Sequence, residues 1–550
     1  MKKSLGPWSL TALGIGAVIG SGIFTVIGTA ISGEQFDTSS MVNTPLASFI
    51  ITHTALAGRP GAGPAIALSM ILVAAVCALT GLCYAELASM IPIAGSAYTY
   101  TYATLGELIA WIIGWDLILE YAGSNMSVSV GFAAHVVDLL DWFGLHPSAR
   151  WISPAYLPSA SGLQDFAGNT IFKSGWHFGF NIPAFLIVMF ITVILVRGIR
   201  ESASTNNMMV ALKLAAILIF VFAVIGFIRP SNWHPFMPNG WSGVLTGGSI
   251  IFFTYIGFDS VSTAAEECRN PQRDLPIGII ATLVVCTVLY VAVAVCLTGL
   301  VPWQSMVGDA APVVNALKKL SLLPGGHPLY WVRLVVLIGA LMGMISSILV
   351  YQIGQSRVWF SMSRDGLLPK VFSNVHPLFR TPAFSTWVAG VVVAIPSGLF
   401  DIGTLADLSN IGTLFAFVLV SVGVIVLRLR DPRRRRGFVV PGGPKQKMSF
   451  AATVARVAAG LAVAAALRYL IGFLPWDYLQ DVLIVALGIG LLIWLWRTLL
   501  LIPLLSVIFC FLLMAGLPII TWYRFIIWLV IGLVIYFFYS RHRSEFARPR

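Results

Sequence analysis

The chain has 550 residues, of which 58% are hydrophobic and only 10% charged, and its mean hydropathy is +0.88. Soluble domains are about 45–50% apolar and 25% charged, so this composition excludes a soluble protein and indicates a polytopic membrane protein. The formal net charge of +12 would suit a nucleic-acid partner, but the basic residues stand at the ends of apolar segments, as the positive-inside rule requires. No nucleic acid is therefore expected as a partner.

Apolar segments of about 20 residues cross the roughly 30 Å hydrocarbon layer as helices. With the N-terminus in the cytoplasm, fourteen such segments leave 24 of the 34 lysines and arginines inside. This asymmetry predicts a multi-pass protein of the cell membrane with both termini cytoplasmic. The expected spans are 10–31, 64–89, 98–139, 179–196, 205–228, 241–267, 275–301, 331–360, 383–400, 404–428, 450–473, 479–496, 498–517 and 522–540.

The first span is rich in glycine and holds no charge from Ser4 to Gly33. Because glycine is a poor helix former, the run Gly20-Ser21-Gly22, with further glycines before it, predicts a helix that unwinds inside the membrane. The alternative is close packing of helices against the small residues of a GxxxG pattern. The span lacks an obvious cleavage site, so it is interpreted as helix one and not as a signal peptide.

Lys213 lies about nine residues into the fifth span, which is about 14 Å at 1.5 Å per residue. An ammonium at that depth cannot easily snorkel, so we expect Lys213 to face the bundle, as a reversible proton carrier or as a permanent charge pinning helices one, five and eight.

On the third span, Asp116 and Glu120 are one turn apart and share a face. Glu120 is a candidate for proton relay or gating, or a structural hydrogen-bond acceptor.

The sixth span carries the sequence FTYIGFD from Phe253 to Asp259, which places a glycine and a carboxylate in mid-segment. An Asp at the centre of a membrane helix costs about 3 kcal/mol, so this span too is predicted to break. Asp259 follows Gly257 by two residues, where it could cap a second half-helix or stand near the substrate. Unwound helices in secondary transporters hold substrates and ions with their exposed backbone groups.

The two broken spans are the first and the sixth, so the first ten helices divide into two sets of five. Because five is an odd number, the second set begins on the opposite side of the membrane from the first. The two sets are therefore expected to form an inverted repeat. We therefore expect a first repeat at 1–228, a second at 241–428, a basic cytoplasmic loop at 429–449 and four peripheral helices with a tail at 450–550. The long first outer loop, Ser32 to Gly63, is expected to hold a short surface helix near Ala47 to Leu56.

Six segments in fixed order resemble the cationic amino acid transporter branch of the amino acid, polyamine and organocation superfamily. The resemblance covers nearly the whole chain. It implies an all-α five-plus-five fold with discontinuous helices one and six, a central amino-acid site and proton coupling. The segments are LGIGAVIGSGIF (13–24), IAGSAYTY (93–100), GWDLILEY (114–121), YIGFD (255–259), AEECRNPQRDLPI (265–277) and SMSRDGLLP (361–369).

The resemblance also implies roles for individual residues. Backbone N–H groups of the first break would bind the substrate carboxylate, and carbonyls of the sixth helix near Phe253 and Ile256 would accept its ammonium. Phe253 would close over the substrate, and Lys213 would replace the cation of sodium-driven relatives. A large ring at Tyr351, in the side-chain pocket, argues for small neutral or medium-sized substrates over arginine and lysine. The full set is Val18, Ile19, Gly20, Ser21, Gly22, Phe253, Ile256, Asp259 and Tyr351 for substrate, and Lys213 with Glu120 for coupling.

The remaining residue types exclude other classes. The eight histidines form no pair at ligand spacing and the six cysteines form no CxxC pair, so neither an enzyme, a metal site nor a cofactor is expected. The predicted function is proton-coupled import of amino acids by a functional monomer, with lipid or a small membrane protein at the peripheral helices. A sensor that binds without transport and an amino-acid exchanger remain as alternatives.

Overall fold

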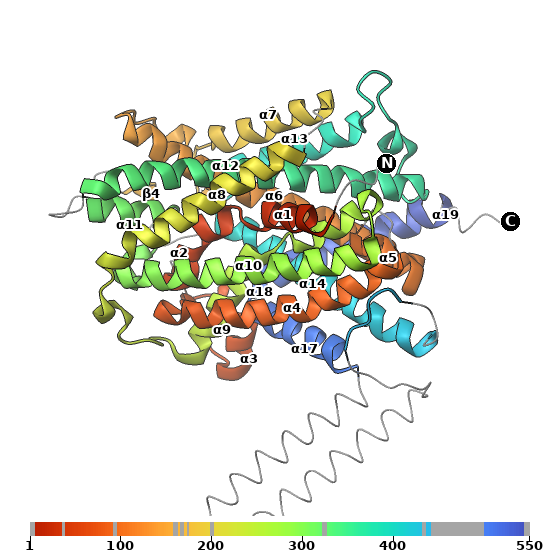
Figure 1. Cartoon of the computed structure of the whole chain (residues 1–550), viewed down its shortest axis with the longest axis horizontal. Helices are drawn as coiled ribbons and strands as arrows, with labels where there is room; N and C mark the ends of the chain where they lie inside the picture. The colour runs from red at the N-terminus through yellow and green to blue at the C-terminus, as the bar shows by residue number, and fades with distance from the viewer. Residues whose placement is uncertain are drawn as a thin grey trace, which may run out of the picture.

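A computed structural model shows an almost entirely helical bundle (Figure 1). It describes residues 6–35, 39–91, 96–157, 163–164, 170–172, 175–198, 203–321, 327–431, 436–441 and 500–543. The long helices are α4 (Ile66–Met90), α6 (Glu107–Trp142), α7 (Ile182–Arg197), α8 (Ala203–Val224), α10 (Pro271–Leu300), α12 (His327–Arg364), α13 (Ala383–Leu399), α14 (Ile402–Arg430), α17 (Leu501–Ala515) and α18 (Ile519–Ile535).

Seven helices in the described part of the chain are long and apolar enough to cross a membrane, or eight when the bent pair of the first span counts as one. That pair is α1 (Pro7–Val18) and the segment Gly22–Ser32, which ends in α2 (Ile27–Ser32). Three further apolar helices, α7, α13 and α17, are shorter. The bundle is therefore a polytopic membrane fold. The expected spans 450–473 and 479–496 lie outside the described residues.

The helices begin and end where the local sequence satisfies their free backbone groups. Asn181 accepts a hydrogen bond from the Ala184 N–H (3.2 Å) at the start of α7, and Gly198 ends that helix with a φ of +74°. Asp401 accepts from the Thr404 N–H (3.1 Å) at the start of α14. Each capping side chain satisfies one of the backbone N–H groups that are free at the start of its helix.

The expected span 98–139 is not one helix. A short helix, α5 (Ser96–Thr104), precedes α6, and Gly106 separates the two with a φ of +96°. A positive φ costs glycine less than any other residue, so the chain can turn here. The turn occurs although the segment remains apolar on both sides of it. The consequence is that α6 begins at Glu107 and extends to Trp142, past the expected end at residue 139.

Short antiparallel strands add a small amount of β-structure to the expected all-α fold. The first outer loop forms a hairpin from β1 (Gly33–Gln35) and β2 (Gly58–Pro60), and the expected surface helix is α3 (Leu46–Thr52). A later loop pairs β3 (Tyr156–Leu157) with β6 (Gly175–Trp176) and β4 (Leu163–Gln164) with β5 (Thr170–Phe172). We call the end of the bundle with these strands and α11 (Pro312–Ser321) the hairpin end; α5 and α19 (Arg541–Arg543) lie at the opposite end (Figure 1).

The helix α18 packs against the bundle through aromatic side chains. Trp115 of α6 stacks on Trp528 of α18 at 4.5 Å between ring centroids, and each indole N–H donates to the other residue's carbonyl, at 2.8 and 3.1 Å. Trp111 donates to the Gly532 carbonyl (2.8 Å). Two reciprocal bonds and a stacked pair fix α18 on the outside of α6.

The central position belongs to α1, which contacts α8, α10 and α12, while α6 contacts α12 and α14. The other broken helix starts with α9 (Gly240–Ile251), continues as η7 (Phe252–Tyr255) and resumes as η8 (Phe258–Glu267). Its segments contact α4, α10 and α14. Both broken helices are therefore enclosed by unbroken ones.

Candidate substrate site

The first break lies between the end of α1 and a π-helical turn, η1 (Gly22–Val26). Ile19 leaves the helix with an extended backbone (φ −79°, ψ 92°), and the two halves differ in direction by 41°. Gly20 donates its N–H to the Val18 carbonyl (3.0 Å), which is not a helical bond. The predicted break is present, and it centres on residues 19–21.

The second break follows η7. Gly257 adopts a φ of +115°, which a residue with a side chain rarely adopts, and a Cβ there would lie 3.1 Å from the Ala17 backbone of α1. Both the backbone conformation and the close approach of helix one therefore favour glycine at this position. Asp259 stands in the first turn of η8, as expected for a residue that starts the second half.

The two breaks lie against each other. A Cβ added to Gly22 would lie 2.7 Å from the Thr254 Cα, so the backbones of η1 and η7 are in direct contact. The hydroxyl of Tyr290, on α10, lies 3.0 Å from the Val18 carbonyl and 2.9 Å from the Thr254 carbonyl. A hydroxyl has one proton, so it donates to one carbonyl at a time and links both breaks through a single group.

Lys213 reaches the first break from α8 and is fully buried. Its ammonium donates to the carbonyls of Gly16 (2.6 Å) and Ile19 (2.8 Å) and to the Ser346 hydroxyl of α12 (3.0 Å). These are the three donor positions of an ammonium, all used. The contacts join α1, α8 and α12. These are the first, fifth and eighth expected spans, which a charged Lys213 was expected to hold together.

Aromatic and acidic side chains surround the second break. Tyr351 of α12 donates to the Ile256 carbonyl (3.0 Å), and its ring lies 6.3 Å from that of Tyr121. Tyr121 of α6 donates to Asp259 (3.3 Å), which is 1% exposed. The carbonyl expected to accept the substrate ammonium therefore accepts a tyrosine hydroxyl in this conformation.

The structure brings most of the predicted site residues together. All nine predicted substrate residues lie at the two breaks or, for Tyr351, donate to one of them, and each is buried. Glu120 is buried on α6, with Asp116 and Asp259 as its acidic neighbours. The roles assigned to these residues stay predictions, including a gate at Phe253 and proton relay through Glu120.

Two tyrosines at the site were not predicted. Tyr290 and Tyr121 stand in long apolar segments, where an aromatic residue indicates only packing, and the chain has 15 tyrosines. A hydroxyl buried in a membrane helix needs a partner, which is one sequence signal that both carry; Tyr121 also ends the GWDLILEY segment of the family resemblance. Among the described residues, no group of three or more His, Cys, Asp or Glu could hold a metal ion.

Two discontinuous helices whose breaks meet inside a helical bundle are the architecture of a secondary transporter. Comparison with known proteins is more specific: the sequence profile of the amino acid permease family matches residues 5–544. The chain belongs to this family of membrane transporters, and it is not an enzyme.

Three curated relatives illustrate the range of the family. The branched-chain amino acid permease BcaP of Bacillus subtilis is 40% identical over 99% of this chain and 94% of its own length. The methylthioribose transporter of the same organism is 38% identical over 99% and 95%. The chloroplastic cationic amino acid transporter 9 of Arabidopsis thaliana is 34% identical over 79% and 68%. Similar sequences thus carry substrates of different charge and chemistry.

Proposed function

We propose that this protein imports amino acids across the plasma membrane by alternating access, coupled to protons. The observation that carries the proposal is the contact between the two helix breaks, linked by the Tyr290 hydroxyl to Val18 and Thr254. Broken helices offer N–H groups with a positive dipole end to a carboxylate, and carbonyls to an ammonium. An amino acid carries both groups on one carbon, which suits two adjacent breaks.

The proposed architecture has fourteen membrane helices, the first ten in two inverted sets of five. The hairpin end faces the outside, and both termini lie in the cytoplasm. In support, the described helices begin with a broken span and meet a second broken span at α9, η7 and η8. The four last helices form a peripheral addition, of which α17 and α18 pack on α14 and α6.

For the substrate we propose a neutral, apolar amino acid, such as one with a branched side chain. Tyr351 donates to Ile256 beside the second break, and its ring is buried there. A tyrosine in this place occupies volume that a long cationic side chain would need. The 40% identity to a branched-chain permease points the same way.

Coupling is proposed for Lys213. Its ammonium is held by two backbone carbonyls of the first break and by Ser346, so any movement of α1 against α8 or α12 changes its surroundings. Burial favours the neutral amine and the carbonyls favour the ammonium. Because these two effects oppose each other, the side chain can gain or lose its proton when the first break rearranges.

Purified protein in liposomes tests the proposal. A panel of unlabelled amino acids and methylthioribose is allowed to compete with labelled leucine, first for binding and then for uptake. Net uptake into empty liposomes supports the transporter. Binding without uptake would indicate a sensor, and uptake only into amino-acid-loaded liposomes an exchanger. Binding of labelled methylthioribose but of no labelled amino acid would indicate a different substrate class.

A further inference from the structure

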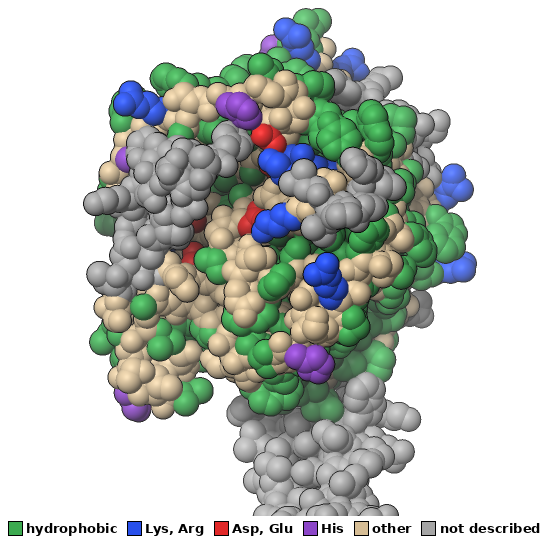
Figure 2. Space-filling model, turned by 90° about the vertical axis from the view of Figure 1, so that its left-hand side faces the viewer, with side chains coloured by type: hydrophobic (Ala, Val, Ile, Leu, Met, Phe, Trp, Pro, Cys, Tyr) green, Lys and Arg blue, Asp and Glu red, His purple; other side chains and the backbone are tan. Residues whose placement is uncertain are grey.

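Arg59 stands in the first outer loop, where an arginine is ordinarily solvated. Here it lies in β2 of the hairpin and is only 4% exposed. Figure 2 looks onto the hairpin end and shows acidic side chains in a hollow, with basic side chains beside them. A buried guanidinium requires partners, because leaving it unpaired costs several kcal/mol. The position of those partners indicates what Arg59 does.

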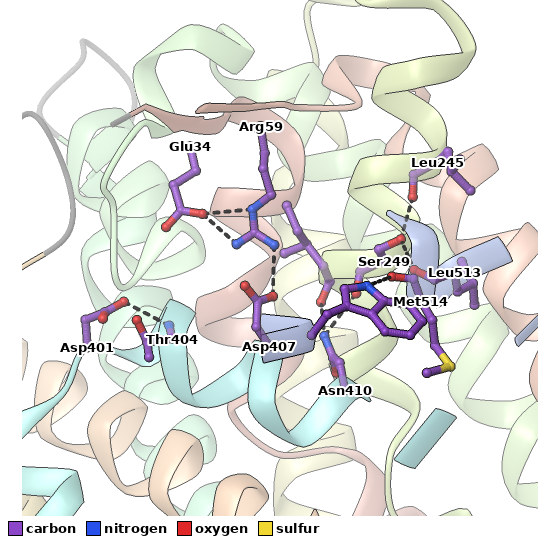
Figure 3. Close-up of polar contacts among 12 residues, drawn as sticks. Glu34, Arg59, Leu245, Ser249, Asp401, Thr404, Asp407, Asn410, Leu513 and Met514 are labelled. Atoms are coloured by element: carbon purple, nitrogen blue, oxygen red, sulfur yellow. Dashed lines mark hydrogen bonds and ion pairs between the residues drawn. The ribbon is translucent and has the colours of Figure 1, made fainter. Parts of the chain in front are cut away.

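The guanidinium joins two elements that are far apart in the sequence (Figure 3). Its Nε and Nη2 donate to one carboxylate oxygen of Glu34 (2.9 and 2.5 Å), and its Nη1 donates to Asp407 (2.9 Å). Glu34 lies two residues past the end of α2, whereas Asp407 lies in the second turn of α14. Through its rigid fork, Arg59 therefore connects the second half of the first broken helix to α14.

The backbone after Arg59 connects the same region to the other broken helix. The Ala62 N–H donates to the Ala30 carbonyl of α2 (3.0 Å), and the Asn239 side chain, just before α9, donates to the Gly61 carbonyl (2.8 Å). A Cβ on Gly61 would lie 2.3 Å from the Gly33 nitrogen, so the hairpin fits closely against its own base. This short segment thus contacts the hairpin-end halves of both broken helices.

A second layer of bonds lies one turn further along α14. The Asn410 amide donates to the Ser249 carbonyl of α9 (2.9 Å), and the Ser249 hydroxyl lies 2.7 Å from the Leu513 carbonyl of α17 (Figure 3). Asp407 and Asn410 are three residues apart and so share a face of α14. This face of α14 is connected to the α2 region through the ion pairs of Arg59, and to α9 through the Asn410 side-chain amide.

We propose that Arg59 is a latch that holds the hairpin end of the transport pathway closed. Opening toward this end requires α2 and α9 to move away from α14, which separates Arg59 from Asp407. In the closed state the pair is buried and bonded, and in the open state both charges are hydrated. An intermediate with one buried, unpaired charge is unfavourable, so the end is either shut or open. The inference rests on the proposed alternating access and makes Arg59 a positioning residue that touches no substrate.

Accessibility of a reporter cysteine tests the latch. Thr25 lies in η1 just beyond the first break and is 1% exposed, and all six native cysteines are buried. Thr25→Cys is labelled with a membrane-impermeant thiol reagent applied to the hairpin side, without substrate. Protein lacking the reporter gives the background rate. The variants are Arg59→Gln, Asp407→Asn and the two combined.

Each single variant is expected to raise the labelling rate at least about fivefold, and the double variant no further, because both remove the same pair. Lys318→Gln is the matched control. Lys318 forms an ion pair with Asp141 (2.7 Å), between α11 and α6, and joins neither broken helix to α14. Its labelling rate should stay within about twofold of the reporter protein alone.

Labelling that is unchanged in both single variants would overturn the latch. A rise in Arg59→Gln but not in Asp407→Asn would also overturn it, since Arg59 would then support only its own hairpin. If Arg59→Gln fails to fold, Arg59→Lys replaces it; it keeps the charge but not the fork, and the latch predicts an intermediate rate. Because no substrate is present, labelling as predicted in a protein that moves no amino acid would sink the proposed function and leave the latch standing.

Discussion

The Tyr290 hydroxyl is the smallest group whose removal tests whether the two breaks work together. Tyr290→Phe deletes one oxygen and leaves the Val18 and Thr254 carbonyls, 3.0 and 2.9 Å away, without their shared donor. The Val18 carbonyl still accepts the Gly20 N–H, so the loss falls on the buried Thr254 carbonyl, and a buried acceptor that loses its donor costs about 1–3 kcal/mol. The ring stays, so the packing against Tyr255, at 5.3 Å between centroids, is kept. The cost therefore falls on the alignment of the breaks.

That cost translates into affinity. If the aligned breaks form the binding-competent state, a loss of about 1–3 kcal/mol reduces its population about 5- to 150-fold, and the dissociation constant for substrate rises by up to that factor. We expect about tenfold weaker binding of the substrate that the competition panel identifies. Equilibrium binding of the radiolabelled amino acid to purified protein in detergent or nanodiscs measures the change.

Tyr255→Phe is the matched control. Tyr255 is equally buried, its hydroxyl donates to the Met70 carbonyl of α4 (3.1 Å), and that bond does not cross between the breaks. Both variants should lower the thermal unfolding midpoint by a similar amount, and only Tyr290→Phe should weaken binding. Equal effects on binding would show that the loss follows from lower overall stability and not from the link between the breaks, and unaltered binding in Tyr290→Phe would refute the reasoning.

Four other perturbations have definite expected results. Gly22→Ala places a methyl group 2.7 Å from the Thr254 backbone, so binding should fall at least about tenfold while detergent-extracted protein stays folded by size-exclusion chromatography; normal binding would place the site elsewhere. Lys213→Met should abolish pH-driven uptake and keep measurable binding, and persistence of gradient-driven uptake would remove Lys213 from coupling. Trp528→Phe loses the indole bond to Trp115, which should destabilise the protein by about 1 kcal/mol in thermal unfolding and leave transport within about twofold. Cysteines at the exposed positions 53 and 542 should be labelled from outside and only after permeabilisation, respectively, and the reverse pattern would overturn the topology.

The helix breaks could be predicted because they depend on local chemistry. A cluster of glycines and a central carboxylate are incompatible with a continuous membrane helix. At the second break, Gly257 adopts a positive φ, which glycine adopts more easily than any residue with a side chain. Lys213 could be placed inside the bundle from its depth alone. The position of Gly106 is a local signal too, although the continuous hydropathy of the segment 98–139 concealed it.

Contacts between distant segments could not be predicted in this way. Arg59 belongs to a polar loop, and only the folded chain brings it within 2.9 Å of a carboxylate 348 residues later. The Tyr290 hydroxyl likewise meets carbonyls from two other helices. A sequence pattern reports periodicity and burial but not which buried groups meet, and that pairing depends on packing across the whole bundle.

The central claim is tested most directly by leucine uptake into liposomes that hold the purified protein, with an acidic exterior, a neutral lumen and no sodium. One pH unit supplies about 1.4 kcal/mol per proton, so one-to-one coupling predicts accumulation up to about tenfold above the external concentration, collapsing when a protonophore is added. Uptake that ignores the pH gradient, requires sodium, or stops at the external concentration would contradict a proton-coupled importer.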